Sequence, residues 1–258
     1  MAWKAWYRDA PDWPEWRPQV QADAHFSSFF TDNLIRVMVR SYDQSAISSA
    51  GQKAGLFERS RRELHYLQAS SGPKLVELLM VGDSVVSFLA GDVLMRIDNA
   101  EWTLPVAQKL LNPEPEDRRR AAALLGKLPF AGPDEDRVWE LLEEVADGDE
   151  EWFMRAQAQN TVGLRSLMTG RLDRARPILS KGLNDQDDSV VQATCQALRI
   201  NRDVRTIPAL INLLERVNRA GGDPVLLLAG QSCLRSLTGV EQDLPPDRWR
   251  DWWRENRP

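Results

Sequence analysis

The chain contains 258 residues, of which 43% are hydrophobic and 28% are charged, and its formal net charge is -5. This composition is typical of a soluble globular protein and argues against intrinsic disorder, while the acidic balance argues against a binder of duplex nucleic acid, which normally presents a basic stripe to the phosphates. No apolar run approaches the roughly 20 residues of a membrane span, and the N-terminus lacks the pattern of a secretory signal. We therefore expect a cytoplasmic protein that does not bind membranes.

Residues 1–25 form an arm rich in tryptophan and proline. Its four tryptophans, Trp3, Trp6, Trp13 and Trp16, are interspersed with prolines that break any long helix. Such an arm can fold back on the first helices or dock into a partner. Trp3 and Trp6 are therefore candidate partner-binding residues.

Residues 26–72 are expected to be helical but irregular. Apolar residues recur at helical spacing over residues 26–42 and again, opposite a group of arginines, over residues 56–69. The Ser-, Ala- and Gly-rich residues 43–55 predict a weaker helix, so the section is either an irregular extension or a degenerate repeat. A Ser-Ser-Gly-Pro stop signal at residues 70–73 ends it.

Residues 73–238 are periodic and contain five copies of a helix pair. One reference residue per copy, which we call the anchor, recurs at separations of 31, 37, 36 and 36 positions. The anchors are Val86, Asp117, Met154, Val190 and Leu226. A small residue stands four positions after each anchor and an aliphatic residue eight positions after it, which predicts a close-packing stripe on one face of the second helix of each pair.

An acidic residue three positions before each anchor predicts where the second helix begins, because a carboxylate there can accept hydrogen bonds from the free amides of the first turn. These residues are Asp83, Glu114, Glu151, Asp187 and Asp223. The first helix of each pair lies upstream, and in four of the five pairs it is expected to open with a proline. These prolines are Pro73, Pro105, Pro177 and Pro208.

The pattern Pro-x-Leu-x-x-Leu-Leu, then an acidic turn, then Val-x-x-x-Ala-x-x-x-Leu resembles the HEAT and HEAT-like repeats of bacteria, particularly the kind grouped with phycobilin lyases. The resemblance covers residues 73–238 and includes the arginine that directly follows the anchor, present here as Arg118 and Arg155. It implies an all-α fold, a right-handed α-solenoid of HEAT-like helix pairs in which the second helices line a concave face.

Residues 239–258 are similar to the ending of many bacterial HEAT-repeat proteins. They contain a Leu-Thr-Gly turn followed by Trp249, Trp252 and Trp253. A solenoid must cover the apolar face of its last repeat, and large aromatic side chains do this efficiently. We expect this segment to be a tryptophan-rich C-terminal cap.

No group of residues in the sequence predicts catalysis. Cys195 and Cys233 fall at apolar helix positions, which favours buried thiols over a disulfide or a nucleophile. His25 and His65 lack the acidic neighbours of a metal site, and the chain has no glycine-rich phosphate loop. We therefore expect a protein that is not an enzyme and holds no metal or cofactor.

The charge pattern places most of the negative charge in the middle of the chain. Residues 113–155 contain thirteen acidic and six basic side chains, a net charge of -7. Within them the run Arg118, Arg119, Arg120 adjoins Glu116 and Asp117, so we predict local charge pairing rather than a nucleic-acid contact.

The second, third and sixth positions after each anchor are expected to be exposed on the second helices. In the middle repeats several of these positions are amides, which both donate and accept hydrogen bonds and suit a peptide backbone or a polar protein surface better than a polyanion. The candidate partner-binding residues on these helices are Phe88, Arg119, Gln157, Asn160, Gln192 and Gln196. The same rule also predicts exposure of Leu89 and Ala193.

The predicted function is an adaptor that binds a protein partner through the concave face, in preference to nucleic acid or a small molecule. Two alternatives remain open. One is a phycobilin-lyase-like protein acting on a bilin-bearing partner, and the other is a HEAT-like DNA glycosylase or DNA-binding protein, which the amide-rich face and the acidic centre disfavour.

Overall fold

The computed structural model describes residues 22–44, 50–81, 83–97, 100–128 and 134–256. These residues form helices joined by turns and contain no strand, which confirms the all-α class. Within the same ranges every helix is too short or too polar to cross a lipid bilayer. The internal contacts divide the chain into two compact units, Met1–Trp102 and Thr103–Pro258. This division falls inside the predicted repeat array, residues 73–238, and at none of the predicted boundaries. The boundaries at residues 25, 72 and 238 therefore stay predictions.

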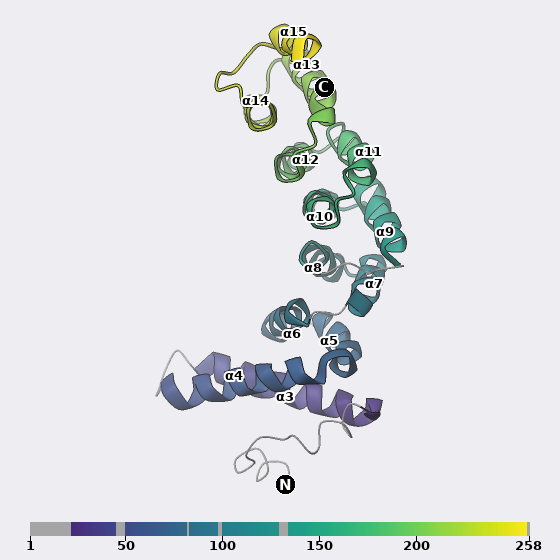
Figure 1. Ribbon diagram of the computed structural model, residues 1–258, viewed down its shortest axis with the longest axis vertical. Coiled ribbons are helices and arrows are strands. Elements are labelled where there is room, and N and C mark those ends of the chain that lie inside the picture. Colours follow the sequence, from purple (N-terminus) through teal and green to yellow (C-terminus); the bar gives the residue numbers. More distant parts are fainter. Residues whose placement is uncertain (1–21, 45–49, 82, 98–99, 129–133, 257–258) are drawn as a thin grey trace. The chain divides into compact units, whose positions relative to one another are not determined.

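The first unit is built on two long helices. In chain order its elements are α3 (Ala24–Gln44), α4 (Ala50–Leu67), η1 (Gln68–Ser71), α5 (Gly72–Leu79), α6 (Ser84–Arg96) and η2 (Ala100–Trp102). α3 packs along α4 and also contacts α5 and α6, which form a pair (Figure 1). The helices predicted over residues 26–42 and 56–69 are present. Of the weak helix predicted at residues 43–55, the described residues belong to the end of α3 and the start of α4.

The second unit arranges its helices in two layers. In chain order its elements are α7 (Thr103–Gln108), η3 (Lys109–Leu111), α8 (Pro115–Leu125), α9 (Glu135–Gly148), α10 (Trp152–Thr169), α11 (Leu172–Gly182), α12 (Asp188–Asn201), η5 (Val204–Thr206), α13 (Ile207–Arg219), α14 (Pro224–Thr238) and α15 (Pro246–Asn256). In one layer α8, α10, α12 and α14 contact one another in turn (Figure 1). In the other, α7 contacts α9, α9 contacts α11, and α11 contacts η5, the turn that leads into α13.

Each helix of one layer also contacts its predecessor in the other layer, giving the pairs α7 with α8, α9 with α10, α11 with α12 and α13 with α14. The second helices predicted from the sequence are the even-numbered layer. Their small residues permit a very close approach: a Cβ built on Gly163 of α10 would lie only 2.8 Å from the backbone of Ala197 on α12. The small-residue stripe of α12 is therefore a helix-packing surface, as predicted.

The acidic residues predicted to start the second helices all occupy the N-cap position. The three aspartates, Asp83, Asp187 and Asp223, accept hydrogen bonds from amides of the first turn at 2.8–3.2 Å. Glu114 and Glu151 make no such bond with their side chains. The extra methylene of glutamate moves its carboxylate away from the amides that an aspartate reaches.

The prediction that proline opens the first helices is wrong for one repeat. Pro73 and Pro208 lie in the first turn of α5 and α13, but Pro177 lies in the interior of α11. α11 begins earlier because α10 ends at Gly170, whose φ of 70° is the left-handed conformation that terminates helices. The sequence pattern therefore predicted the start of this helix five residues too late.

The C-terminal segment packs on the last helix pair through α15. Trp249 is fully buried, and its Nε1 donates a hydrogen bond of 2.7 Å to the side chain of Gln231 on α14. The other end of Gln231 donates to the carbonyl of Leu244, and Trp252 stacks edge-on against Trp249. Trp249 is buried as a cap residue should be, while Trp252 and Trp253 are half-buried.

Candidate partner-binding surface

The outward faces of α8, α10 and α12 carry most of the residues predicted to bind a partner. We call the surface defined by Arg119, Gln157, Asn160, Gln192 and Gln196 the even-layer surface. The stripe four and eight positions after each anchor is buried against the other helices. Its members in the second unit are Ala121, Ala158, Thr194 and Gly230, with Leu125, Val162, Leu198 and Leu234. Since an α-helix turns about 100° per residue, burying this stripe leaves the opposite arc of each helix towards solvent.

α10 contributes the longest part of this surface. Phe153, Gln157, Asn160, Leu164 and Leu167 follow one another at spacings of three or four residues, so they lie along one face. The first four are half-buried and Leu167 is 58% exposed. The stripe is therefore polar at its centre and apolar at both ends.

The amides at the centre of the surface are not used to hold the fold together. Within the described residues, the side chains of Gln157, Asn160, Gln192 and Gln196 make no hydrogen bond. Gln231, by contrast, uses both ends of its amide to fasten the C-terminal segment. Four amides on two adjacent helices are thus available to hydrogen-bond a ligand.

Two residues expected to be exposed are buried. Leu89 is 1% exposed and Ala193 is 7% exposed. Both stand three positions after an anchor, which is about 60° from the anchor on the helical wheel, whereas the second and sixth positions are about 160° and 120° away. The third position therefore lies at the edge of the buried stripe, and a small or aliphatic side chain there turns inward.

The remaining candidates lie elsewhere. Phe88 is 62% exposed on α6, in the first compact unit. Trp3 and Trp6, together with Trp13 and Trp16, lie outside the described residues.

The arginine run on α8 is used for ion pairs. Arg119 donates to Glu116, and Arg120 lies 3.2 Å from Asp117, which agrees with the predicted local pairing. Arg118 differs, because it makes two hydrogen bonds, of 2.8 and 2.9 Å, to Asp149 in the turn between α9 and α10.

Arg155 repeats the arrangement of Arg118 one helix pair later. It makes two hydrogen bonds, of 2.8 and 2.9 Å, to Asp185, and it also donates to the carbonyl of Asp149. Arg118 likewise donates to the carbonyl of Asn112. The arginine after the anchor therefore ties the turn within its own pair to the turn of the next pair, which fixes the spacing of the even-numbered helices.

The Asp185 carboxyl makes stability depend on pH. Burial alone would raise its pKa, but hydrogen bonds from Arg155 and from the amide of Asp187 outweigh burial and hold the pKa below its ordinary value of about 3.9. Because the folded carboxyl has the lower pKa, its stabilising effect is complete above about pH 4 and is lost as the pH falls through the folded pKa.

Arg155→Gln is expected to lower the free energy of unfolding at pH 7 by about 1–3 kcal/mol, because it removes charge-assisted hydrogen bonds to Asp185. The loss should shrink as the pH falls below about 4 and Asp185 becomes protonated. Urea denaturation at several pH values measures this. Arg137→Gln, which removes an exposed pair with Glu140, should change the free energy by less than about 0.5 kcal/mol. A penalty for Arg155→Gln that is the same at pH 7 and pH 3 would contradict this role.

Sequence reasoning missed the apolar end of the surface, Leu167 and Met168. They are 58% and 39% exposed near the C-terminal end of α10. The repeat pattern follows each second helix for only eight residues after its anchor, but α10 continues to Thr169. Gly170, which terminates α10, was the sequence signal that could have shown how far this helix extends.

The two cysteines are packing residues. Burial raises the pKa of the Cys195 thiol to about 12 and raises that of Cys233 as well. Thiols with such pKa values are poor nucleophiles at neutral pH. His25 and His65 are both exposed, and no three His, Cys, Asp or Glu side chains in the described ranges are placed to hold a metal ion.

No protein-family model and no curated protein matches the sequence. Among solved structures, the chain is similar to an engineered protein that was a structural-genomics target, with 15% sequence identity and a TM-score of 0.44. That similarity covers 80% of this chain and 97% of the engineered one. A similarity this weak assigns neither a fold family nor a function.

Proposed function

We propose that the helix pairs form a right-handed solenoid of HEAT-like repeats. The proposal is supported by the alternation of the two layers in the second unit and by the aspartates that cap α12 and α14. It is also supported by the pairs Arg118 with Asp149 and Arg155 with Asp185, which repeat with the period of the helix pairs. In such a solenoid the even-numbered helices line the concave side.

We propose further that the protein is a non-enzymatic adaptor and that its partner is another protein, bound on the even-layer surface. The observation that carries this proposal is the set of four amides on α10 and α12 that are exposed or half-buried and make no side-chain hydrogen bond within the described residues. They are flanked by exposed Leu167 and Met168, so the surface combines hydrogen-bonding groups with apolar contact area. Protein interfaces likewise combine apolar contact area with direct hydrogen bonds.

The charge of the surface favours the same class of ligand. Arg119 is the charged member of the set, and Glu116 already pairs with it. A polyanion is held by several cations, of which this surface has one, whereas a polypeptide backbone offers both donors and acceptors to Gln and Asn side chains.

Changing the four amides to acids tests the proposal. The variant Gln157→Glu, Asn160→Asp, Gln192→Glu, Gln196→Glu keeps side-chain size but removes the amide N–H donors and adds four negative charges. It is expected to weaken capture of the partner by at least about tenfold, since the hydrogen bonds from four amides are lost and the four new carboxylates must be desolvated on binding. Affinity capture with the full chain, followed by mass spectrometry and titration of the identified partner, measures the effect. Circular dichroism should show unchanged helicity.

A control variant carries the same number of new charges away from the even-layer surface. Gln108→Glu, Gln186→Glu, Asn212→Asp and Asn218→Asp all alter exposed residues of the other layer or of its turns. This control should capture the partner as the parent does. Equal loss in both variants, or loss in neither, would move the binding site off the even-layer surface.

The same preparations distinguish the two alternatives. A phycobilin-lyase-like protein would copurify with a coloured tetrapyrrole or bind one when it is added. A DNA glycosylase or DNA-binding protein would bind duplex DNA at low ionic strength and lose it as salt is added.

A further inference from the structure

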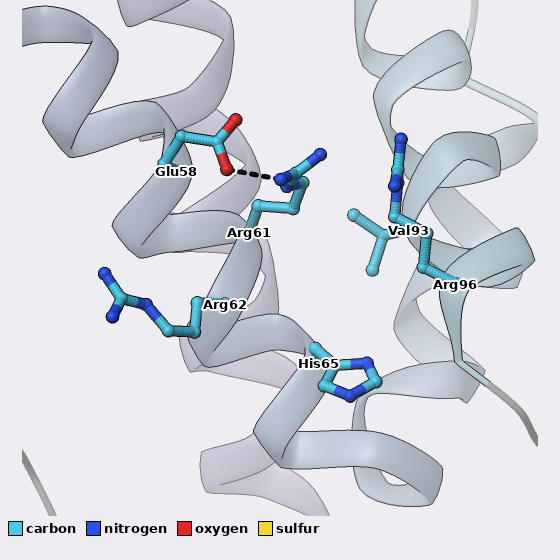
Figure 2. Close-up of a pocket in the computed structure, with 6 residues that line it drawn as sticks. All are labelled: Glu58, Arg61, Arg62, His65, Val93 and Arg96. Carbon is cyan, nitrogen blue, oxygen red and sulfur yellow. Dashed lines mark hydrogen bonds and ion pairs between the residues drawn. The ribbon is translucent and has the colours of Figure 1, made fainter.

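A basic pocket lies in the first compact unit, between α4 and α6. Its volume is about 540 Å³, within the range of roughly 300–1,000 Å³ that small-molecule sites occupy. The residues that line it are Glu58, Arg61, Arg62, His65, Val93 and Arg96. Figure 2 shows Arg61 and His65 extending from α4 into the gap that faces Arg96 and Val93 on α6, while Arg62 extends away from α6.

The lining carries an excess of fixed positive charge. Three of the six residues are arginines, whose guanidinium groups stay charged at any pH a protein encounters, and one is an acid. Asp92, beside the lining on α6, offsets a second arginine, so one positive charge remains in excess. Val93 is almost fully buried and gives the pocket an apolar floor. The pocket therefore suits an anion that is attached to a less polar group.

The two acids near the pocket orient the arginines without saturating them. Glu58 accepts a hydrogen bond from Arg61, and Asp92 accepts two from Arg96, at 3.0 and 3.1 Å. A guanidinium has five N–H donors, so each arginine keeps donors for a ligand. Both side chains remain reachable, since Arg61 is 31% exposed and Arg96 is 52% exposed.

We propose that this pocket binds a phosphorylated small molecule through its phosphate group. The planar fork of a guanidinium matches two oxygens of a phosphate, and a phosphate monoester presents three acceptor oxygens to donors on both sides of the gap. Arg61 and Arg96 approach from opposite helices, and His65 adds a further polar group. The volume leaves room beyond the phosphate for an organic group against Val93. The site is independent of the partner-binding proposal, which concerns the second unit.

Calorimetric titration of the full chain with phenyl phosphate, at constant ionic strength, tests the proposal. Saturable binding is expected, and Arg61→Gln and Arg96→Gln should each weaken it by about tenfold or more, as loss of a charge-assisted hydrogen bond does. Arg36→Gln is the matched control, because Arg36 is an exposed arginine of the same unit that pairs with Asp32 on α3. Its affinity for phenyl phosphate should stay within about twofold of the parent value.

Two further ligands test which parts of phenyl phosphate the pocket recognises. Phenyl sulfate, which carries a single charge, should bind more weakly than phenyl phosphate, and inorganic phosphate should also bind more weakly because it lacks the organic group. Inorganic phosphate binding as tightly as phenyl phosphate would overturn the small-molecule assignment. The absence of saturable phenyl phosphate binding, or equal losses in Arg61→Gln and Arg36→Gln, would overturn the site itself.

Discussion

Arg165→Ala is expected to lower the free energy of unfolding by about 3–5 kcal/mol, the typical cost of breaking a buried ion pair from one side. Arg165 lies on α10 with its side chain fully buried, and its Nε donates a hydrogen bond of 2.8 Å to Glu135 at the start of α9. It also donates to the carbonyls of Leu125 and Leu128, at the end of α8. Its loss would take the guanidinium away from the buried carboxylate of Glu135 and remove this donor from two carbonyls.

Urea denaturation of the full chain, followed by circular dichroism, measures the effect of Arg165→Ala. Arg171→Ala serves as a control because it removes a cross-helix pair, with Asp136, that is exposed to solvent; a change below about 1 kcal/mol is expected. The double variant Arg165→Met with Glu135→Leu should recover much of the loss, since it removes the buried carboxylate together with the guanidinium. A single Arg165→Ala variant that unfolds like the parent would show that Arg165 does not hold α8, α9 and α10 together.

Gly163→Ala should destabilise the second unit by about 1–3 kcal/mol, the usual cost of overpacking. In an open helix the same change would stabilise by about 0.5–1 kcal/mol, because glycine is a poor helix former. Here the new methyl group would lie 2.7–2.8 Å from Ala197, including its backbone, so α10 and α12 would have to move apart. The steric cost therefore exceeds the gain in helix propensity, and the net change in the free energy of unfolding is a loss.

Gly148→Ala is the matched control for Gly163→Ala. Gly148 is likewise a helical glycine, the last residue of α9, but a Cβ there would meet nothing within 4 Å. Thermal and urea denaturation should show a neutral or slightly stabilising effect for Gly148→Ala and a clear loss for Gly163→Ala. Equal effects of the two substitutions would contradict the close contact between α10 and α12.

The sequence predicts the helix pairs because their determinants are local. The N-cap aspartates and the small residues after each anchor act within one or two turns of their own helix, and a periodic pattern is enough to find them. The start of α11 was missed because it depends on how α10 ends at Gly170, and the buried state of Leu89 and Ala193 depends on how far the packed stripe extends around each helix.

The candidate site was predicted in part for the same reason. Arg119, Asn160, Gln192 and Gln196 are exposed or half-buried because the repeat places them away from the buried stripe, and Gln157 is half-buried at its edge. Arg165 with Glu135, and the pocket between α4 and α6, could not be predicted, because each joins side chains from different helices at distances that only the folded chain defines. The sequence shows the arginines of residues 56–69, but it does not predict that α6 lies opposite them.

Hydrogen–deuterium exchange of the full chain, alone and in complex with its captured partner, tests the central claim most directly. If the even-layer surface binds the partner, amides of α10 and α12 should gain protection on binding, while those of α9 and α11 should not change. Protection confined to α9 and α11, or absent from the whole unit Thr103–Pro258, would contradict the proposed binding surface.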